Sequence, residues 1–257
     1  MASRIGKNLR TRALKRATQR WSTLADDAPT MRMSMLRQLR NRARALRHQL
    51  DRFLFAADAR LTLPMIGPNA IQTPLHTDWS YRPEVWRGPL AQQGLVAVRS
   101  RSQLGEEVVL HHDCKISELT LRQIRNTRED DLAPFGLRLD VFRFDGSFLA
   151  LSIELPVDAV EGLQRRHILR LSCVAEMEKP LEIFARLNIR HGPNTEQVVR
   201  ELPLSEDEVW VEFDLAYTKL NEKRVERMWV ELILEGAEMN QIVLRDITLS
   251  RRPRAEL

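Results

Sequence analysis

From residue 137 to residue 249, apolar and polar side chains alternate along the chain in a series of short runs. Such alternation predicts half-buried β-strands, because successive side chains on a strand point to opposite faces. The runs cover residues 137–141, 149–155, 169–177, 181–189, 209–215, 228–234 and 243–249. Turn-forming Gly, Pro, Asn and Asp residues separate them, without intervening helical patterns. We therefore predict a mainly β fold, a jelly-roll-like antiparallel β-sandwich, over residues 108–257.

Residues 1–60 have a helical period instead. Apolar residues three and four positions apart form one seam, which contains Leu36, Leu39, Ala43, Leu46, Leu50 and Phe53. A weaker seam contains Leu14, Ala17, Trp21 and Leu24. Pro29 lies between the two seams and disfavours helix at Ala28. These patterns predict an amphipathic helical segment, either a hairpin or a bent pair.

Residues 61–107 connect these two regions. Five prolines interrupt any long helix in this segment. The segment also carries Trp79, Tyr81 and Trp86, whose large rings usually pack against other apolar groups. We therefore expect it to drape over the sandwich rather than to act as a flexible linker.

Charge divides the chain in the same way. Residues 1–60 contain fifteen Arg and Lys against four Asp and Glu, whereas the remaining residues contain 25 against 31. Most of the cations are arginines, which suit bidentate contacts to phosphate. We select Arg37, Arg40, Arg44 and Arg47, which flank the apolar seam of the second helix, as attachment residues.

The basic helices have three candidate partners. An apolar seam favours self-association into a homo-oligomer or docking on another protein. The excess of arginine favours an anionic membrane surface. Nucleic acid could bind by charge alone, but no helix-turn-helix reader or RNA-recognition motif is present, so specific nucleic-acid recognition is the weakest of the three.

Composition also limits the cellular setting and the chemistry. No apolar stretch is long enough to span a bilayer, and no signal-peptide core follows the basic N-terminus. Two cysteines, Cys114 and Cys173, are too few for a disulfide framework. We expect a cytoplasmic protein, with membrane-surface association left open. The run His111-His112-Asp113-Cys114 lacks a second ligand pair, so we expect neither a metal nor a cofactor.

The candidate ligand site is the face opposite the core stripes. Its members are the arginines, amides, carboxylates and indoles at Arg186, Asn188, Arg190, Trp210, Glu212, Asp214, Trp229 and Glu231. If their three strands are neighbours, rings and planar polar groups lie side by side, which is the mixture that saccharide recognition uses. The alternative is that other segments cover this face and bury the two tryptophans as a second small core.

The same carboxylates raise the question of catalysis. Glu212 and Asp214 share one strand face, and Glu231 and Glu235 share another. Glycoside hydrolysis needs two carboxyls about 5–9 Å apart, which neighbours on one strand face can provide. Solvated strand faces commonly carry such acids, so we expect a protein without enzymatic activity.

Residues 167–252 resemble jelly-roll domains of the carbohydrate-binding-module and galactose-binding type. The resemblance lies in the run of long strands that ends in Gln241-Ile-Val-Leu-Arg-Asp-Ile-Thr-Leu249. His76-Thr-Asp-Trp79, residues 188–197 and Asn221-Glu-Lys-Arg224 resemble an uncharacterised alphaproteobacterial family of unknown function. We expect a module that binds a glycan-like or protein ligand on a sheet face. A structural assembly protein and a carbohydrate-active enzyme are the alternatives.

Overall fold

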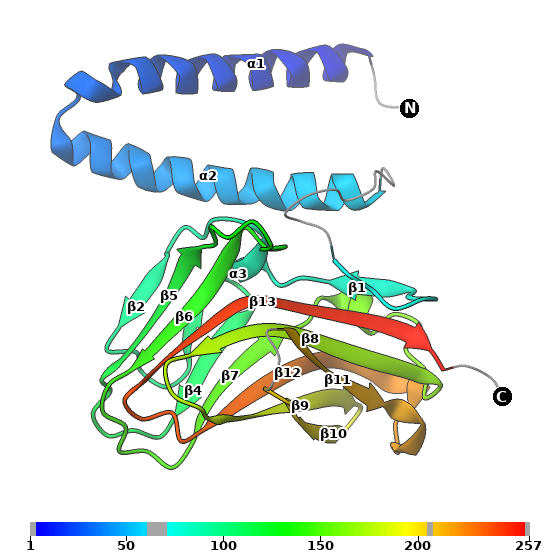
Figure 1. Cartoon of the computed structure of the whole chain (residues 1–257). Coiled ribbons are helices and arrows are strands. Elements are labelled where there is room, and N and C mark those ends of the chain that lie inside the picture. Colours follow the sequence, from blue (N-terminus) through cyan, green and yellow to red (C-terminus); the bar gives the residue numbers. More distant parts are fainter. Residues whose placement is uncertain (1–3, 61–70, 205–207, 255–257) are drawn as a thin grey trace. The chain divides into compact units, whose positions relative to one another are not determined.

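The computed structural model describes residues 4–60, 71–204 and 208–254. The described residues form two compact units, Met1–Arg47 and His48–Leu257. The first unit contains α1 (Arg4–Asp27), a 3-10 turn (Ala28–Thr30) and the first half of α2 (Met33–Arg60). Pro29 is within the turn between the helices, as the sequence predicts. The two helices run in opposite directions on either side of this turn (Figure 1).

The second unit is an antiparallel β-sandwich (Figure 1). Among the described residues, the first sheet has seven strands, in the order β11-β8-β13-β6-β5-β2, with β1 paired to β13. Their bounds are β1 (Trp79–Tyr81), β2 (Gly94–Val96), β5 (Leu119–Arg125), β6 (Phe135–Val141), β8 (His167–Met177), β11 (Glu208–Asp214) and β13 (Asn240–Pro253). The long strand β13 lies at the centre of this sheet, because it pairs with β8 along most of its length and also with β6 and β1.

The second sheet has six strands within the described residues, in the order β10-β9-β12-β7-β4-β3. Their bounds are β3 (Ser102–Leu104), β4 (Val108–His112), β7 (Leu149–Glu154), β9 (Glu182–His191), β10 (Asn194–Glu201) and β12 (Val225–Glu235). Among its described residues, the second unit also contains the second half of α2, one short helix, α3 (Glu84–Arg87), and three 3-10 turns (Val157–Ala159, Leu215–Tyr217 and Glu222–Arg224). The predicted β-sandwich is confirmed, and all seven alternating runs are strands of it.

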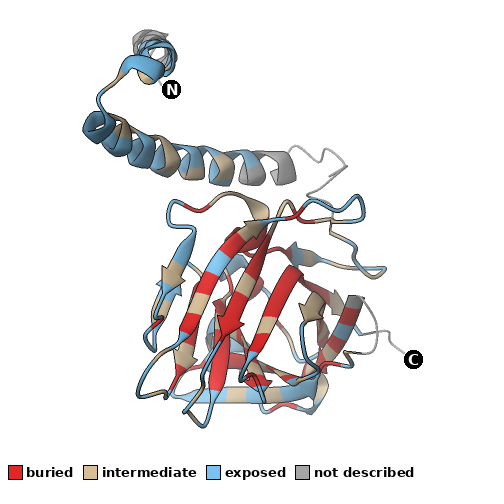
Figure 2. Ribbon diagram, turned by 60° about the vertical axis from the view of Figure 1, so that its left-hand side comes forward, coloured by how far each residue is buried: buried red, intermediate tan, exposed pale blue. Residues whose placement is uncertain are grey.

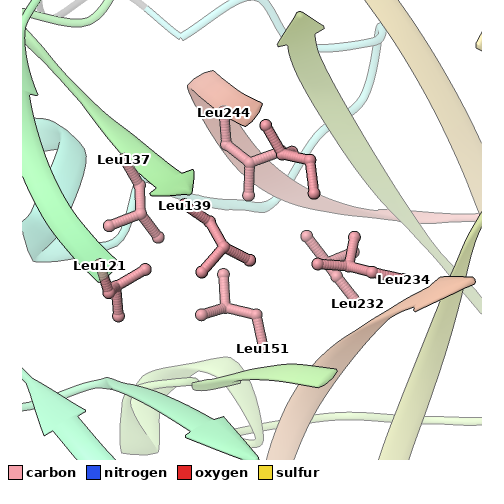
Figure 3. Close-up of a pocket in the computed structure, with 8 residues that line it drawn as sticks. Leu121, Leu137, Leu139, Leu151, Leu232, Leu234 and Leu244 are labelled. Atoms are coloured by element: carbon pink, nitrogen blue, oxygen red, sulfur yellow. The ribbon is translucent and has the colours of Figure 1, made fainter. Parts of the chain in front are cut away.

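Figure 2 shows buried positions in red along the strands, and the buried apolar residues of both sheets form one core. A cavity of about 10 Å³ remains at its centre. Figure 3 shows that leucines from both sheets surround it, among them Leu139, Leu151 and Leu232. A space of this size with an entirely apolar lining does not hold a stable water molecule. The core is therefore close-packed.

The segment that we expected to drape over the sandwich is part of it. From Trp79 onward it supplies β1, β2 and β3, which are hydrogen-bonded into the two sheets. Trp86 is fully buried, and its Nε1 donates a hydrogen bond to the backbone oxygen of Leu244 at 2.9 Å. Tyr81 and Trp86 are thus buried and Trp79 is partly buried, and their segment extends the sheets as well as covering them.

The boundary between the units also differs from the predicted domain limit at residue 60. The second half of α2, from His48, groups with the sandwich. Within this unit, His48 Nε2 lies 3.4 Å from the buried carboxylate of Glu84. Glu84 also closes the turn at Gly105, where φ is +72° and an added Cβ would collide with the carboxylate. Only glycine fits this position without strain.

Candidate functional site

The side chains that we predicted to share one face lie on two different sheets. β9 and β12 are neighbours in the second sheet, whereas β11 pairs with β8 at the edge of the first. Because the outer faces of a sandwich point away from each other, the single site that the prediction required does not form. Alternation along a strand identifies which residues share a face but not which strands are adjacent.

One half of the predicted set remains together on the second sheet. Arg186 Nε donates to the carboxylate of Glu231 at 2.6 Å, and Trp229 Nε1 donates to the same carboxylate at 3.2 Å. Asn188 is fully buried and accepts a hydrogen bond from Gln197 at 2.9 Å. These groups satisfy one another's hydrogen-bonding capacity.

The rest of this face is paired in the same way. The guanidinium of Arg227 lies over the Trp229 ring, 4.9 Å from its centre, and also pairs with Glu154. Arg190 pairs with Glu226 at 3.4 Å. A ligand on this face would have to displace these contacts, which makes it a weaker candidate than the sequence indicated.

The other half of the predicted set is at the free edge of the first sheet. Trp210 is 49% exposed, and the guanidinium of Arg170 stacks on it at 3.9 Å from the ring centre. The carboxylate of Glu212 is bound by Arg170 and by Arg252. Asp214 lies at the end of the same strand. Trp210 is therefore not part of a second core, and its open ring face is a small, isolated platform.

A groove of about 790 Å³ lies on the outer face of the first sheet. β5, β6 and the start of β13 form its floor, and β2 borders it. Cross-strand pairing places Val96, Thr120, Asp140 and Gln241 in one row across these strands. The row therefore brings a hydroxyl, a carboxylate and an amide to the same floor.

A second row lies beside the first and supplies the positive charge. Arg122 on β5 is paired directly with Arg138 on β6. Gly94 is opposite Arg122, and a Cβ at this glycine would lie only 3.2 Å from the Cβ of Arg122. A side chain there would press on Arg122, so the glycine leaves the arginine open to the groove.

Asp140 holds the two rows together. Its Oδ2 accepts a hydrogen bond from Thr120 at 2.8 Å, and its Oδ1 accepts one from Arg138 at 2.6 Å. Arg122 lies further away, with 3.9 Å between its Nε and Oδ2, and it is about half exposed. One carboxylate thus faces two guanidinium groups, which leaves positive charge at Arg122. We call this site, defined by Thr120, Arg122, Arg138, Asp140 and Gln241, the arginine groove.

Apolar side chains and a fixed loop form one end of the arginine groove. Phe142 and Met239 are more than half exposed there, although both are large apolar side chains. Asn240 is buried and holds Lys179 through two backbone hydrogen bonds of 2.9 and 2.8 Å. The groove therefore combines an apolar end, a polar floor and a lysine whose backbone is held in place.

In the His111–Cys114 run, the side chains of His112 and Asp113 are engaged in local hydrogen bonds. His112 is buried between two backbone contacts, with Nε2 2.8 Å from the oxygen of Val98 and Nδ1 accepting from the N–H of Cys114. Asp113 accepts hydrogen bonds from Ser147, which keep the pKa of its carboxyl below the usual value. Across the described parts of the chain, no three His, Cys, Asp or Glu side chains are grouped to hold a metal ion.

The predicted attachment residues are on α2. Arg37, Arg40 and Arg47 are exposed, and Arg44 is half-buried. Among the helices that the structure describes, none is long and apolar enough to cross a membrane.

The sequence analysis missed the arginine groove. A signal was present, because Thr120 and Arg122 alternate with buried leucines, as do Arg138 and Asp140. What the sequence could not supply was the pairing of β5 with β6 and of β6 with β13, which places these four residues side by side.

These observations define a jelly-roll-like β-sandwich that follows a basic helical segment. The chain belongs to a family described as "Family of unknown function (DUF6478)", whose sequence model matches residues 1–257. This confirms the predicted membership of a family of unknown function. A comparison with curated proteins gives no match.

Several solved structures are similar to the sandwich. One is the family 11 carbohydrate-binding module from Clostridium thermocellum, with a TM-score of 0.39 and 10% identity over 64% of this chain and 97% of that one. Another is the xylan-binding CBM22-1 domain from Paenibacillus barcinonensis, with a TM-score of 0.37 and 8% identity over 57% and 87%.

Longer chains also match. Tailspike protein 4 of bacteriophage CBA120 has a TM-score of 0.39 and 9% identity over 55% of this chain. The chain spans 19% of that tailspike and 25% of a Clostridium thermocellum xylanase that contains a CBM22-1 module. At these identities the likeness concerns the fold and not the ligand.

Proposed function

We propose that this protein is a non-enzymatic binding module that holds a saccharide in the arginine groove. The observation that carries the proposal is the juxtaposition of Arg122, Arg138, Asp140, Thr120 and Gln241 on the floor of one open groove. Its volume of about 790 Å³ falls within the range of about 300–1,000 Å³ that is typical of small-ligand sites.

The donors and acceptors of the groove suit a polyhydroxylated ligand. Guanidinium groups donate in a plane, carboxylate and amide oxygens accept, and each can bind a pair of neighbouring hydroxyls. Within the described residues, the Gln241 side chain makes no hydrogen bond and is available to a ligand. Phe142 and Met239 offer apolar surface to the hydrophobic face of a sugar ring.

The state of the carboxylates supports binding rather than catalysis. Both oxygens of Asp140 already accept hydrogen bonds from side chains of the groove. Glu212 is held by two arginines, and Asp214 accepts from the backbone N–H of Ala216 and pairs with Arg254. These carboxylates are thus held by neighbouring donors and cations, which fits a role in shaping a binding site better than a role in proton transfer.

The N-terminal helices are the attachment device in this proposal. The exposed arginines Arg37, Arg40 and Arg47, with Arg44, would contact an acidic partner surface. We place the protein in the cytoplasm, since Cys114 and Cys173 are both free thiols.

A glycan array followed by calorimetry on the selected oligosaccharide tests the proposal. Arg122→Ala removes a half-exposed donor of the groove, and we expect Kd to rise roughly tenfold to a hundredfold, the range for a hydrogen bond to a charged group. The matched control is Arg190→Ala, which removes an exposed arginine from the outer face of the second sheet and should leave Kd unchanged.

Two results would contradict the proposal. If the full chain binds no glycan on the array, a saccharide is excluded as the ligand. Loss of binding in Arg190→Ala, with normal binding in Arg122→Ala, would instead place the ligand on the face that the sequence analysis favoured.

A further inference from the structure

A second groove lies within the first unit, between α1 and the first half of α2. Its volume is about 420 Å³. Trp21 and Leu24 from α1 and Leu39 from α2 provide its apolar lining. Arg16, Arg20 and Arg42 surround that lining. We call this site the helix groove.

The charge of the helix groove is not compensated. Its lining includes three arginines and no acidic residue. In the described part of the chain, Arg16, Arg20 and Arg42 make no ion pair. Residues 1–47 contain thirteen Arg and Lys against two Asp. An anionic partner is therefore favoured over a neutral one.

The apolar side chains of the same unit are also not packed into a buried core. No residue from Ala13 to Arg47 is buried. Leu14 and Leu46, which belong to the two apolar seams, are 71% and 41% exposed. A pair of helices that exposes its apolar seams in this way requires an apolar environment on that side.

We propose that the helix groove binds the head group of an anionic phospholipid, with the two helices lying in the plane of the membrane surface. The three arginines would bind the phosphate, and Trp21 with the leucines would contact the boundary of the acyl region. Cationic and apolar side chains thus lie on the same side of the helix pair. A bilayer surface offers both partners, because its anionic head groups lie directly above its apolar acyl chains.

The other occupants fit less well. A second copy of the chain would bring the same excess of eleven positive charges against this unit, and such like-charge contact opposes association. A nucleic acid satisfies the arginines but places its phosphates and sugars against Leu24 and Leu39, where an acyl chain gains more from burial.

This inference deepens the attachment part of the proposed function and does not depend on the saccharide ligand. If the chain does not bind the vesicles, the proposal for the arginine groove is unaffected. If the chain binds no glycan on an array, the proposal for the helix groove is unaffected. The two proposals therefore fail separately.

Sedimentation of the full chain with vesicles tests the inference. We expect binding to phosphatidylcholine vesicles that contain about a fifth phosphatidylserine, and little binding to phosphatidylcholine alone. The triple variant Arg16→Gln, Arg20→Gln, Arg42→Gln should bind roughly a hundredfold more weakly, because each arginine near an anionic surface contributes about fivefold.

The matched control removes the same charge from the second unit. Arg125, Arg143 and Arg200 are exposed there and line neither groove. The variant Arg125→Gln, Arg143→Gln, Arg200→Gln has the same net charge as the groove variant, and we expect a loss of less than about tenfold. Circular dichroism confirms that both variants keep their helices.

A second readout locates the contact. Vesicles with bromine-labelled acyl chains should quench part of the tryptophan emission, and Trp21→Phe should remove that part. Equal losses in the two triple variants, or quenching that persists in Trp21→Phe, would overturn the helix groove as the lipid site. Self-association of the lipid-free chain that the groove variant abolishes would assign the groove to a second copy instead.

Discussion

The ion pair between Arg82 and Asp246 gives the clearest test of how the segment after the helices is built into the sandwich. Arg82 follows β1, and Asp246 lies at a register shift in β13. Arg82 Nε and Nη2 donate to the two carboxylate oxygens at 2.8 and 2.7 Å. The side chains are 1% and 12% exposed. The pair therefore joins residues 164 positions apart inside the protein.

Removal of one partner of the Arg82–Asp246 pair should lower the free energy of unfolding substantially. Arg82→Met leaves the Asp246 carboxylate buried without its bidentate donor, which typically costs about 3–5 kcal/mol. A domain has a total stability of about 5–15 kcal/mol, so the loss is a large share. The double variant Arg82→Met, Asp246→Leu removes both charges of this pair. It should recover most of the stability, because apolar replacements of buried pairs are often neutral.

Urea unfolding followed by tryptophan fluorescence measures these changes as shifts in midpoint at constant m-value. The control is Arg128→Met, because Arg128 pairs with Glu176 at 2.6 Å but is 56% exposed, and such pairs contribute about 0–1 kcal/mol. The reasoning is refuted if Arg82→Met costs no more than Arg128→Met, or if the double variant is less stable than both single variants.

Two further predictions concern stability. Leu151→Ala should enlarge the apolar cavity of Figure 3 and cost about 2–5 kcal/mol, whereas Leu151→Met should cost less than about 1.5 kcal/mol; equal urea midpoints for the two variants would contradict the packing described here. Burial, together with the nearby Arg251, lowers the pKa of His167 below its ordinary value of 6.5. The unfolded chain then binds the proton more readily, so stability should fall as the pH drops from 6.5 through the lowered pKa. His167→Asn should have a flatter stability profile over this window, and an unchanged slope would refute the assignment.

The strands of the core could be predicted because their alternation is strong. Leu169, Leu171 and Cys173 of β8 are buried, as the period indicates. β10 was missed because this edge strand, Asn194–Glu201, buries none of its residues fully and so has little apolar alternation. Strands of three residues, such as β1 and β2, are too short to show a period at all.

The candidate site could be predicted only in part. The sequence placed Trp210 and Trp229 on outward faces, and the structure agrees. It could not show that β11 and β12 belong to different sheets, since strand neighbours are set by contacts between residues far apart in the chain. Arg122 and Asp140 meet for the same reason, through the pairing of β5 with β6.

In the proposed function, the ligand binds the outer face of the first sheet, at the arginine groove. Hydrogen–deuterium exchange of the full chain, with and without the oligosaccharide that an array selects, locates the bound ligand. We expect slower exchange in residues 119–125, 135–141 and 239–242, with residues 184–190 unchanged. Protection confined to residues 184–190 and 226–233 would contradict the proposal.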